Sequence, residues 1–305
     1  MTPRRTCFKT IQQPNKANGS AMHSQSEGNL VGDEIECLLA FLGTSTRLAV
    51  LTGAGISTAS GIPGYRDADG NWQRKPPLTH QEFIADLAVR KRYWARSMLG
   101  WPMMRDARPN TAHIALARLA QQDRVAHLIT QNVDGLHTAA GSMNVLELHG
   151  RLRQVRCMDC NATHAREWLQ ASLVAANPHL SATSATVAPD GDADIDANFN
   201  DFEIAPCAAC GGMLKPDVVF YGDSVPLPRA RAALAAVAAA DALLIVGSTV
   251  MVRSGYRLCE AAHAAGKPIA AINLGRTRAD PLLSLKLQID CGAALAGLAD
   301  SLCSA

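Results

Sequence analysis

Four short apolar runs that end in small or polar residues constrain the fold of this chain more than any other feature. Short strands that are apolar throughout are typical of parallel sheets covered by helices on both faces. The sequence therefore predicts an α/β fold, with helices at Asp33–Leu42 and Gly255–Ala265 and a last short strand at Leu287–Gly292. The four runs are Arg47–Gly55, Val125–His137, Asp241–Thr249 and Lys267–Gly275.

The ends of these runs predict one ligand-binding crevice. In open α/β sheets, ligands bind beyond the carboxyl ends of the strands. Every predicted strand ends in small or polar residues there, and one glycine-containing end alone would be weak evidence. The four ends are Gly53–Gly55, Gln131–Asp134, Gly247–Thr249 and Asn273–Gly275.

The first of these ends begins a glycine loop, "GAGISTASGIPGYRD", from Gly53 to Asp67. Gly53 and Gly55 permit a tight turn and a close approach of the backbone to a pyrophosphate. A dinucleotide fingerprint needs a third glycine where Thr58 stands, and an acidic residue at the end of a second strand. The loop departs from both requirements, which disfavours a dehydrogenase. A purely structural strand–turn–helix remains an alternative.

Two C-x-x-C pairs, Cys157/Cys160 and Cys207/Cys210, predict a metal site. Four thiolates suit a tetrahedral, structural zinc ion with no position open for catalysis. Redox-active or unrelated cysteines are the alternative. The spacing between the pairs exceeds that of ordinary zinc ribbons, so an insertion must lie between them. We therefore predict that residues 151–216 form a small zinc-binding module within the larger domain, which comprises residues 34–150 and 217–305.

Composition excludes several classes of protein. The chain has 305 residues, a formal net charge of +2 and a pI near 8.1, so no strongly basic field points to nucleic acid. No apolar run is long enough to cross a membrane. Residues 1–33 are polar and are predicted to be a flexible tail. We expect a cytoplasmic protein of a bacterium, or a mitochondrial matrix protein if the tail is a transit peptide.

His149 ends the stretch "NVLELHG" beside a glycine. Histidine can act as a general base near neutral pH. A lone histidine is more often a core or surface residue, and its position near the polar strand ends is what favours a catalytic role.

Together these stretches resemble the sirtuin family of NAD-dependent protein deacylases over about residues 34 to 292. The matching motifs are "GAGISTASGIPGYR", "TQNVDGLH", "LELHG", the two C-x-x-C pairs, "LKPDVVFYGD", "VGST" and "INLG". "RYWARSMLGWP", "APDGD" and "GGMLKPDVVFYGD" are similar to the class II branch, which includes a mitochondrial sirtuin with lipoamidase and ADP-ribosyltransferase activities. The resemblance implies a Rossmann-like NAD-binding domain, a small zinc domain, and an acyl-lysine peptide in the cleft between them.

The resemblance also assigns residues to NAD. The glycine loop would hold the pyrophosphate, Arg66 and its neighbours would fold over the cofactor, and Tyr65 would cover the reactive sugar. Asn132 and Asp134 would hold the nicotinamide, Asn273 the adenosine ribose, and Cys291 would lie near the adenine. The full set of expected contacts is Gly53, Ala54, Gly55, Ile56, Ser57, Pro63, Tyr65, Arg66, Gln131, Asn132, Val133, Asp134, Gly247, Ser248, Thr249, Asn273, Leu274, Gly275 and Cys291.

By the same resemblance, the reaction consumes NAD. Loss of nicotinamide would expose the ribose carbon to the acyl oxygen of the modified lysine, and His149 would act as general base on the ribose hydroxyls. The acyl group would pass to ADP-ribose, releasing lysine. His149, Asn132 and Asp134 are the expected catalytic residues. The peptide would add as a strand beside the segment formed by Val219, Phe220, Tyr221 and Gly222.

Tyr93 and Arg96 bear on the choice of acyl group. They lie three apart on a predicted helix and so share a face. A similar pair in desuccinylase-type sirtuins grips an acidic acyl group, so this pair could bind a terminal carboxylate. A core tyrosine and a solvent-exposed arginine are the alternative.

Other functions compete with the deacylase. Mono-ADP-ribosyl transfer to protein would use the same NAD site. A non-catalytic interaction module is disfavoured by the intact His149, Asn132 and Asp134. The oligomeric state stays open.

Overall fold

A sheet of six parallel strands, in the order β3-β2-β1-β7-β8-β9, forms the centre of the larger of two lobes. The computed structural model describes residues 24–43, 47–73, 77–180 and 199–303. The strands are β1 (Leu48–Thr52), β2 (Val125–Thr130), β3 (Leu146–Glu147), β7 (Ala242–Val246), β8 (Ile269–Ile272) and β9 (Leu285–Leu287). The predicted α/β class with a parallel sheet is confirmed.

The carboxyl ends of the central strands lie level with one another. Thr52 is opposite Thr130 on one side and Val246 on the other, and Val246 is opposite Ile272. The residues that follow these strands therefore meet at one edge, as the predicted crevice requires.

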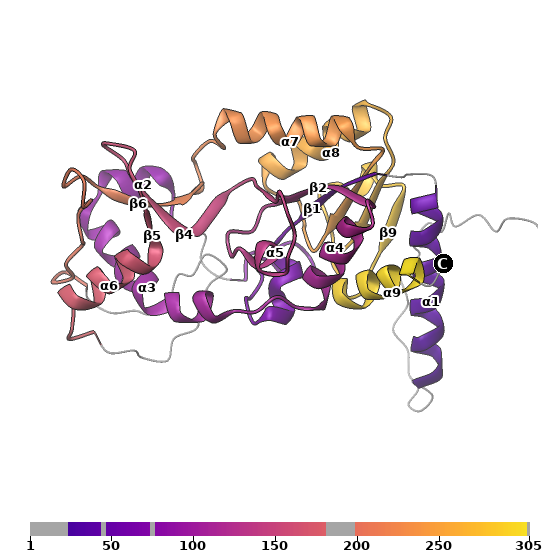
Figure 1. The fold of residues 1–305 in the computed structure, drawn as a ribbon, viewed down its shortest axis with the longest axis horizontal. Coiled ribbons are helices and arrows are strands. Elements are labelled where there is room, and N and C mark those ends of the chain that lie inside the picture. The colour runs from indigo at the N-terminus through magenta and orange to yellow at the C-terminus, as the bar shows by residue number, and fades with distance from the viewer. Residues whose placement is uncertain (1–23, 44–46, 74–76, 181–198, 304–305) are drawn as a thin grey trace, which may run out of the picture.

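Helices cover both faces of this sheet (Figure 1). One face packs on α1 (Ser24–Gly43), α4 (Thr111–Gln121) and α9 (Cys291–Cys303), and the other on α7 (Leu227–Ala239) and α8 (Arg253–Ala264). Within β1, Leu48 and Val50 face the first layer, whereas Ala49 and Leu51 face the second. The strands β1, β7 and β8 are buried at every position, which explains why they are apolar along their length, apart from the terminal Thr52, rather than at alternate positions.

The smaller lobe combines two separate stretches of the chain. Its antiparallel sheet consists of β5 (Thr163–Ala165), β4 (Gly150–Cys157) and β6 (Leu214–Val218). The helices α2 (His80–Ala85), α3 (Leu87–Asp106) and α6 (Arg166–Ala176) share one apolar core with this sheet. The lobe is therefore larger than the predicted module 151–216, because α2 and α3 bury their aromatic side chains there.

Three short helices complete the described chain. These are α5 (Leu136–Ala139) and two 3-10 helices, Ala54–Ser60 and Asp280–Leu282.

The structure corrects two predicted boundaries. The first helix begins at Ser24 rather than Asp33, so it enters the segment predicted as a tail, of which residues 1–23 lie outside the described residues. The last strand ends at Leu287, and Cys291 begins α9, so a strand at Leu287–Gly292 was wrong. That stretch instead forms the turn into α9, where Asp290 accepts a hydrogen bond from the Ala293 N–H at 2.9 Å. The stretch "APDGD", residues 188–192, is also outside the described residues.

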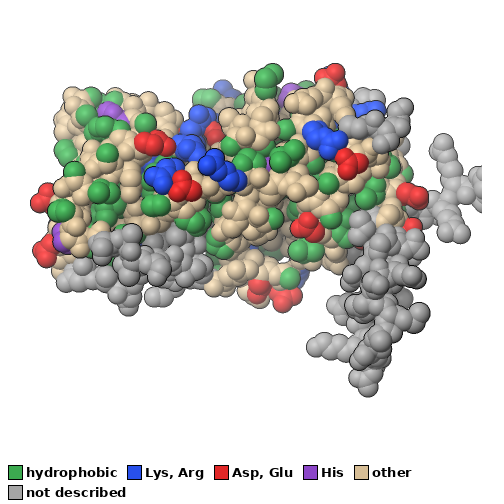
Figure 2. Space-filling model, turned by 60° about the horizontal axis from the view of Figure 1, so that its bottom comes forward, with side chains coloured by type: hydrophobic (Ala, Val, Ile, Leu, Met, Phe, Trp, Pro, Cys, Tyr) green, Lys and Arg blue, Asp and Glu red, His purple; other side chains and the backbone are tan. Residues whose placement is uncertain are grey.

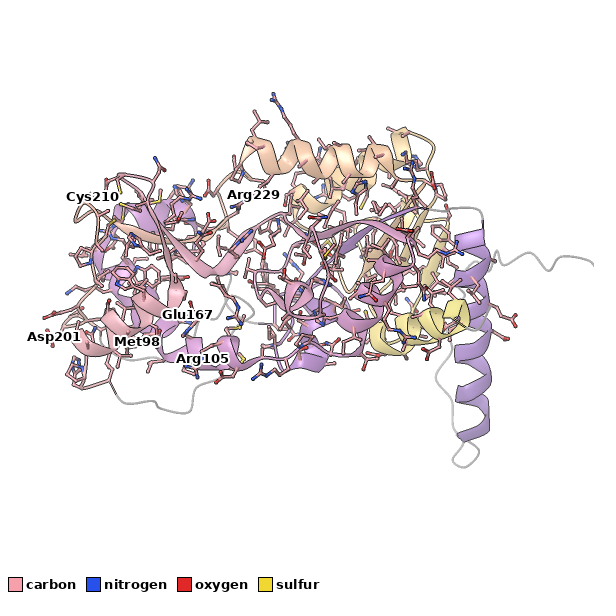
Figure 3. The ribbon with its side chains drawn as sticks, viewed as in Figure 1. Met98, Arg105, Glu167, Asp201, Cys210 and Arg229 are labelled. Carbon is pink, nitrogen blue, oxygen red and sulfur yellow. The ribbon has the colours of Figure 1, made fainter. Side chains whose placement is uncertain are left out.

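One of the connections between the lobes runs from β3 through His149 into β4. Gly150 adopts φ +88°, and a Cβ there would lie 1.9 Å from the Asp217 carbonyl oxygen, so only glycine fits this crossing. The Asp217 carboxylate contacts Arg156 on β4 at 3.4 Å and Arg229 on α7 at 3.1 Å. Arg229 thus reaches from the large lobe towards the small one (Figure 3).

The surface is mixed in charge on the face seen in Figure 2. Basic side chains gather near its middle with acidic ones beside them, which agrees with the small net charge of +2. Among the described residues, no helix combines the length and the apolar character needed to cross a membrane.

Candidate active site

A cavity of about 720 Å³ opens at the carboxyl edge of the large sheet. Its walls are the segments that follow β1, β2, β7 and β8, together with the segment after β6 in the small lobe. The predicted crevice is therefore confirmed, and it lies where the two lobes meet.

The glycine loop packs directly against the end of β7. The Gly53 N–H donates to the Val246 carbonyl at 3.1 Å, and the Gly55 N–H donates to the Gly247 carbonyl at 2.8 Å. A Cβ on Gly53 would lie 2.7 Å from the Ser248 side chain, and Gly247 has φ +58°. Close contact between two cavity-lining loops is thus the structural reason for these glycines.

Asn132 and Asp134 form one network with the glycine loop. The Asn132 amide donates to the Gly53 carbonyl at 3.1 Å and to Ser57 Oγ at 3.0 Å. The Ser57 hydroxyl donates to Asp134 Oδ2 at 2.8 Å, and Asp134 Oδ1 accepts the Leu136 N–H at 2.9 Å. These bonds fix a buried carboxylate and an amide side by side in the cavity wall, as predicted.

His149 lies in the same wall with a defined tautomer. Its Nδ1 is 3.0 Å from the Gln131 carbonyl oxygen, which can only accept, so Nδ1 carries the proton and Nε2 is the acceptor nitrogen. Burial, with a smaller contribution from Arg229, lowers the pKa of His149 to about 4, although the hydrogen bond to the Gln131 carbonyl raises it. The ring is therefore neutral at pH 7 and able to accept a proton at Nε2.

The far end of the cavity is lined by the segments after β7 and β8. The Ser248 hydroxyl donates to Gln131 Oε1 at 2.6 Å, and the Asn273 amide donates to the Gly275 carbonyl at 2.9 Å. Burial raises the pKa of the Cys291 thiol to about 12, so it stays uncharged beside the cavity. The predicted residues Gly247, Thr249 and Leu274 also line this end.

The segment after the glycine loop covers the cavity mouth. Tyr65 and Arg66 line the cavity, and both contact Trp72, with the Arg66 guanidinium 3.9 Å from the indole centroid. Trp72 packs in turn on Tyr221 of the small lobe, with ring centroids 5.6 Å apart. Sequence reasoning missed Trp72, which joins this segment to the opposite wall.

The segment Val219–Gly222 forms that opposite wall. The Val219 N–H donates to the His149 carbonyl at 2.8 Å, and the Tyr221 carbonyl accepts the His80 N–H at 2.8 Å. These bonds hold the predicted peptide-binding segment beside the predicted base.

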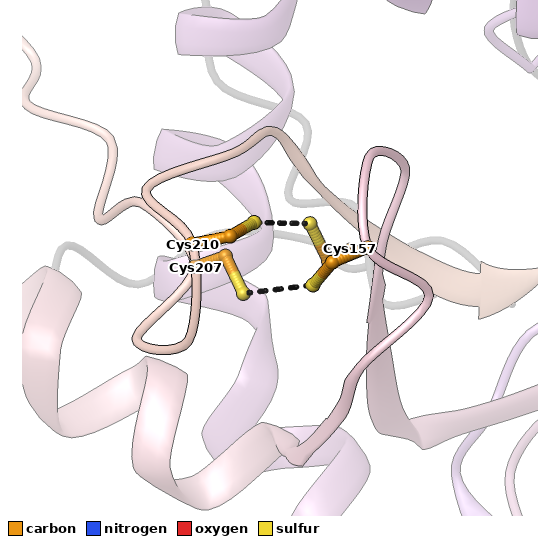
Figure 4. A group of neighbouring side chains, drawn as sticks. Cys157, Cys207 and Cys210 are labelled. Carbon is orange, nitrogen blue, oxygen red and sulfur yellow. Dashed lines mark hydrogen bonds between the residues drawn. The ribbon is translucent and has the colours of Figure 1, made fainter.

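The four paired cysteines converge in the small lobe (Figure 4). Cys157 Sγ is 3.5 Å from Cys210 Sγ, Cys160 Sγ is 3.8 Å from Cys207 Sγ, and all four sulfurs lie within 4.8 Å of one another. A tetrahedral zinc ion with Zn–S bonds of about 2.3 Å separates its sulfurs by about 3.8 Å, so the cluster fits such an ion. The knuckles join β4 to the segment before β6.

The comparisons with known proteins agree with this geometry. The family model described as "Sir2 family" matches residues 53–254. The chain belongs to the Sir2 family. It is 56% identical to an "NAD-dependent protein deacetylase" of Bordetella bronchiseptica, over 86% of this chain and 96% of that protein. It is 54% identical to a protein of the same description from Xanthomonas campestris pv. campestris, over 85% of this chain and 88% of that protein.

Solved Sir2 structures share the fold of this Sir2 protein. One, described as "Structural Basis for the Mechanism and Regulation of Sir2 Enzymes", is 30% identical with a TM-score of 0.70, and covers 89% of this chain and 98% of that one. Another, "Sir2-p53 peptide-NAD+", is 26% identical with a TM-score of 0.68, and covers 88% and 97%.

Four residues predicted for the site of this Sir2 protein do not line the cavity. Ile56 is 2% exposed and packs in the core of the large lobe, and Pro63 is also absent from the lining. Tyr93 is 6% exposed, because its ring packs edge-on against Phe83 and Phe220, and neither Tyr93 nor Arg96 lines the cavity. The core-tyrosine alternative therefore fits Tyr93, and a Tyr93–Arg96 clamp on an acyl carboxylate gains no support.

Sequence reasoning also missed the wall that α7 and α8 contribute to the Sir2 cavity. Ala230, Ala233 and Leu234 line it from α7, and Arg253, Ser254 and Arg257 from α8. The first turn of the helix after β7 lies at the carboxyl edge of the sheet, so the general rule for α/β crevices could have indicated Ser254.

Proposed function

We propose that this Sir2 protein is an NAD-dependent protein lysine deacylase. It transfers the acyl group of a modified lysine to ADP-ribose and releases nicotinamide and the free lysine. The observation that carries the proposal is the neutral His149, whose Nε2 lone pair lies in the cavity wall that also holds Asn132 and Asp134. The curated relatives described as NAD-dependent protein deacetylases support it.

The cavity suits NAD as the co-substrate. The Asp134 carboxylate would accept from the N–H groups of the carboxamide, whereas the Asn132 amide, whose two hydrogens are donated to the Gly53 carbonyl and Ser57 Oγ, would hold the glycine loop in place beside it. The loop glycines bring backbone close to the pyrophosphate, and Ser248 and Asn273 lie where an adenosine ribose would reach. NAD itself supplies the bond that is broken, between nicotinamide and ribose.

His149 would remove the proton from a ribose hydroxyl. Its tautomer, fixed by the Gln131 carbonyl, presents the acceptor nitrogen to the cavity. Tyr65 and the segment around it would exclude water from the reacting sugar, which protects a reactive carbon from hydrolysis. The acyl-lysine would enter between this segment and Val219–Gly222, where the protein substrate adds by backbone pairing.

Zinc would be structural. Four thiolates fill a tetrahedral shell, so the ion has no open position for a water or substrate. Bound there, it would tie β4 to the segment before β6 and so support the peptide-binding wall.

We further propose that the chain belongs to the class II branch. The stretch Arg92–Pro102 supports this, as does "GGMLKPDVVFYGD", which contains β6 and the wall of the cavity. Membership of this branch would make mono-ADP-ribosyl transfer to protein the main alternative activity.

A mass-spectrometric panel tests these proposals. The purified chain receives NAD and one peptide carrying acetyl-, butyryl-, lipoyl-, succinyl- or glutaryl-lysine, and His149→Tyr is the matched variant. We expect NAD-dependent loss of acyl groups that requires His149. Labelled NAD that modifies protein, without any acyl product, would replace the deacylase by ADP-ribosyl transfer.

A further inference from the structure

The acceptor nitrogen of His149 already has a partner. Nε2 is 2.7 Å from Ser254 Oγ. Because Nδ1 carries the ring proton, Nε2 is the acceptor and the Ser254 hydroxyl is the donor. A neutral imidazole has one lone pair in its plane at this nitrogen, and this hydrogen bond occupies it.

This occupancy matters for proton transfer. A ribose hydroxyl cannot donate to Nε2 while Ser254 does. The Ser254 oxygen still has acceptor capacity, and across the described residues its side chain has no second hydrogen-bond partner. Ser254 also lines the cavity, so a hydroxyl of a bound ligand can reach it.

The packing of α8 explains why Ser254 reaches His149. Gly255 follows it, and a Cβ on Gly255 would lie 2.6 Å from Gln131 Nε2. Gln131 is also the residue whose carbonyl holds His149 Nδ1. The absent side chain at Gly255 therefore lets α8 approach the residue that orients the base.

We propose that the ribose proton reaches His149 through Ser254. The ribose O–H bond breaks as its proton passes to Ser254 Oγ, and the Ser254 O–H bond breaks as its own proton passes to Nε2. His149 becomes an imidazolium, and the ribose oxygen keeps the electron pair with which it attacks the acyl carbon. This inference rests on the proposed deacylase function and adds Ser254 to its catalytic residues.

The surroundings of His149 agree with a relay. Burial and Arg229 on α7 lower its pKa, and the charged groups that α8 adds to the cavity wall are Arg253 and Arg257. A donated hydrogen bond from Ser254 also stabilises the neutral ring. Removing that donor should therefore raise the pKa of His149.

The test compares Ser254→Ala with Ser254→Thr, which keeps a hydroxyl. Ser301→Ala is the matched control. Like Ser254, Ser301 lies in a helix, but it is outside the cavity and its hydroxyl donates to the carbonyl of Gly297 in its own helix. Single-turnover deacylation and exchange of labelled nicotinamide into NAD are measured for each. Exchange reports only the steps before the proton moves.

We expect Ser254→Ala to lose about 10²-fold in single-turnover deacylation while nicotinamide exchange stays near wild type. Ser254→Thr should recover most of the rate. The single-turnover rate is also measured in H₂O/D₂O mixtures. Its dependence on the deuterium fraction should indicate two protons in transfer for the wild type and fewer for Ser254→Ala. The acid limb of the Ser254→Ala pH profile should also move to higher pH.

The outcomes separate the two proposals. An active wild type with Ser254→Ala at wild-type rate, or a one-proton dependence in the wild type, overturns the relay and leaves the deacylase intact. A parallel loss of exchange and deacylation in Ser254→Ala makes Ser254 structural and also overturns the relay. A wild type that binds NAD and removes no acyl group overturns the deacylase, and the relay with it.

Discussion

The Ser57 hydroxyl donates a 2.8 Å hydrogen bond to Asp134 Oδ2 and thereby ties the glycine loop to the turn after β2. Both side chains are buried. Because Ser57 Oγ also accepts from the Asn132 amide, it links the two groups expected to bind nicotinamide.

We expect Asp134→Ala to reduce turnover more than Ser57→Ala. The first leaves the Leu136 N–H and Ser57 without their acceptor, whereas the second removes one hydroxyl and leaves the carboxylate in place. Misplacing bound groups by about 1 Å can cost about 10²-fold in rate, which is the loss expected for Asp134→Ala. Nicotinamide exchange measures it, and equal, small losses in both variants would contradict this view of the network.

Gly53→Ala should weaken NAD binding and destabilise the large lobe. The added Cβ would lie 2.7 Å from the Ser248 side chain, so the loop or the segment after β7 must move. Overpacking of this kind costs about 1–3 kcal/mol of unfolding free energy. Calorimetric NAD titration and urea unfolding test this, with Gly43→Ala as control, since a Cβ there has nothing within 4 Å. Unchanged NAD affinity in Gly53→Ala would count against the loop as part of the NAD site.

Cys207→Ser should lose the zinc ion and lower the melting temperature. The substitution removes one of the four thiolate ligands, so the tetrahedral zinc shell is incomplete. Structural zinc contributes directly to the stability of the fold, so its loss should destabilise the protein. Cys37→Ser, outside the four-cysteine cluster, is the control and should keep the metal. Elemental analysis decides the matter, and full zinc content in Cys207→Ser would show that the cluster is no zinc site.

His164 should increase the affinity of the four-cysteine cluster for zinc, although it is not itself one of the ligands. Its Nε2 is 3.3 Å from Cys207 Sγ, and its ring stacks on Trp168 with centroids 4.7 Å apart. His164→Phe keeps a ring beside Trp168 but removes the donor, and we expect zinc to be held about tenfold less tightly. Chelator competition measures the change. His164→Gln, which keeps a donor, should lose less, and the reverse order would assign the effect to stacking.

Stability should fall as pH falls below about 6.5, because of two buried histidines. Burial lowers the pKa of His137 from its usual 6.5 to about 3 and also lowers that of His113, and the ring centroids are 4.7 Å apart. The unfolded chain binds protons between these values and the folded chain does not. Each histidine therefore costs no stability through ionisation above about pH 6.5, and below that pH each lowers the free energy of unfolding by up to about 1.4 kcal/mol per pH unit.

Urea unfolding between pH 7.5 and pH 4.5 tests this expectation. His137→Gln should flatten the decline, whereas replacing the exposed His263 should not. A decline of the same slope in His137→Gln would assign the acid sensitivity to other groups.

The strands and most of the cavity wall could be predicted from the sequence, because a strand that is buried on both faces appears as a continuous run of apolar residues. β1 is apolar except for its last residue, Thr52. The glycine that follows it, Gly53, lies where a side chain would collide with Ser248, as the predicted close approach of the backbone requires. By contrast, α3 buries five of the six residues between Tyr93 and Met98, so no amphipathic period marks the side facing the small lobe. A boundary between lobes could not be predicted from such a segment.

The contacts of individual side chains were harder to predict than the helices and strands. Tyr93 and Arg96 share a helix as expected, yet the cavity opens elsewhere, because Tyr93 is enclosed by other aromatic rings. The position of Ser254 after β7 could have indicated that it lies near the cavity, but a single serine near a helix start is common, and its partner became known only through the 2.7 Å contact with His149. Cytoplasmic location and protein substrates stay predictions.

The chain passes from the large sheet to the small one at His149 and Gly150. If the two lobes rotate against each other, this crossing is where they pivot, because Asp217 forms ion pairs beside it with Arg156 on β4 and with Arg229 on α7. Points at a pivot move least when two bodies rotate against each other. Such a rotation would widen the cleft at its mouth, where Trp72 contacts Tyr221, while the base kept its position.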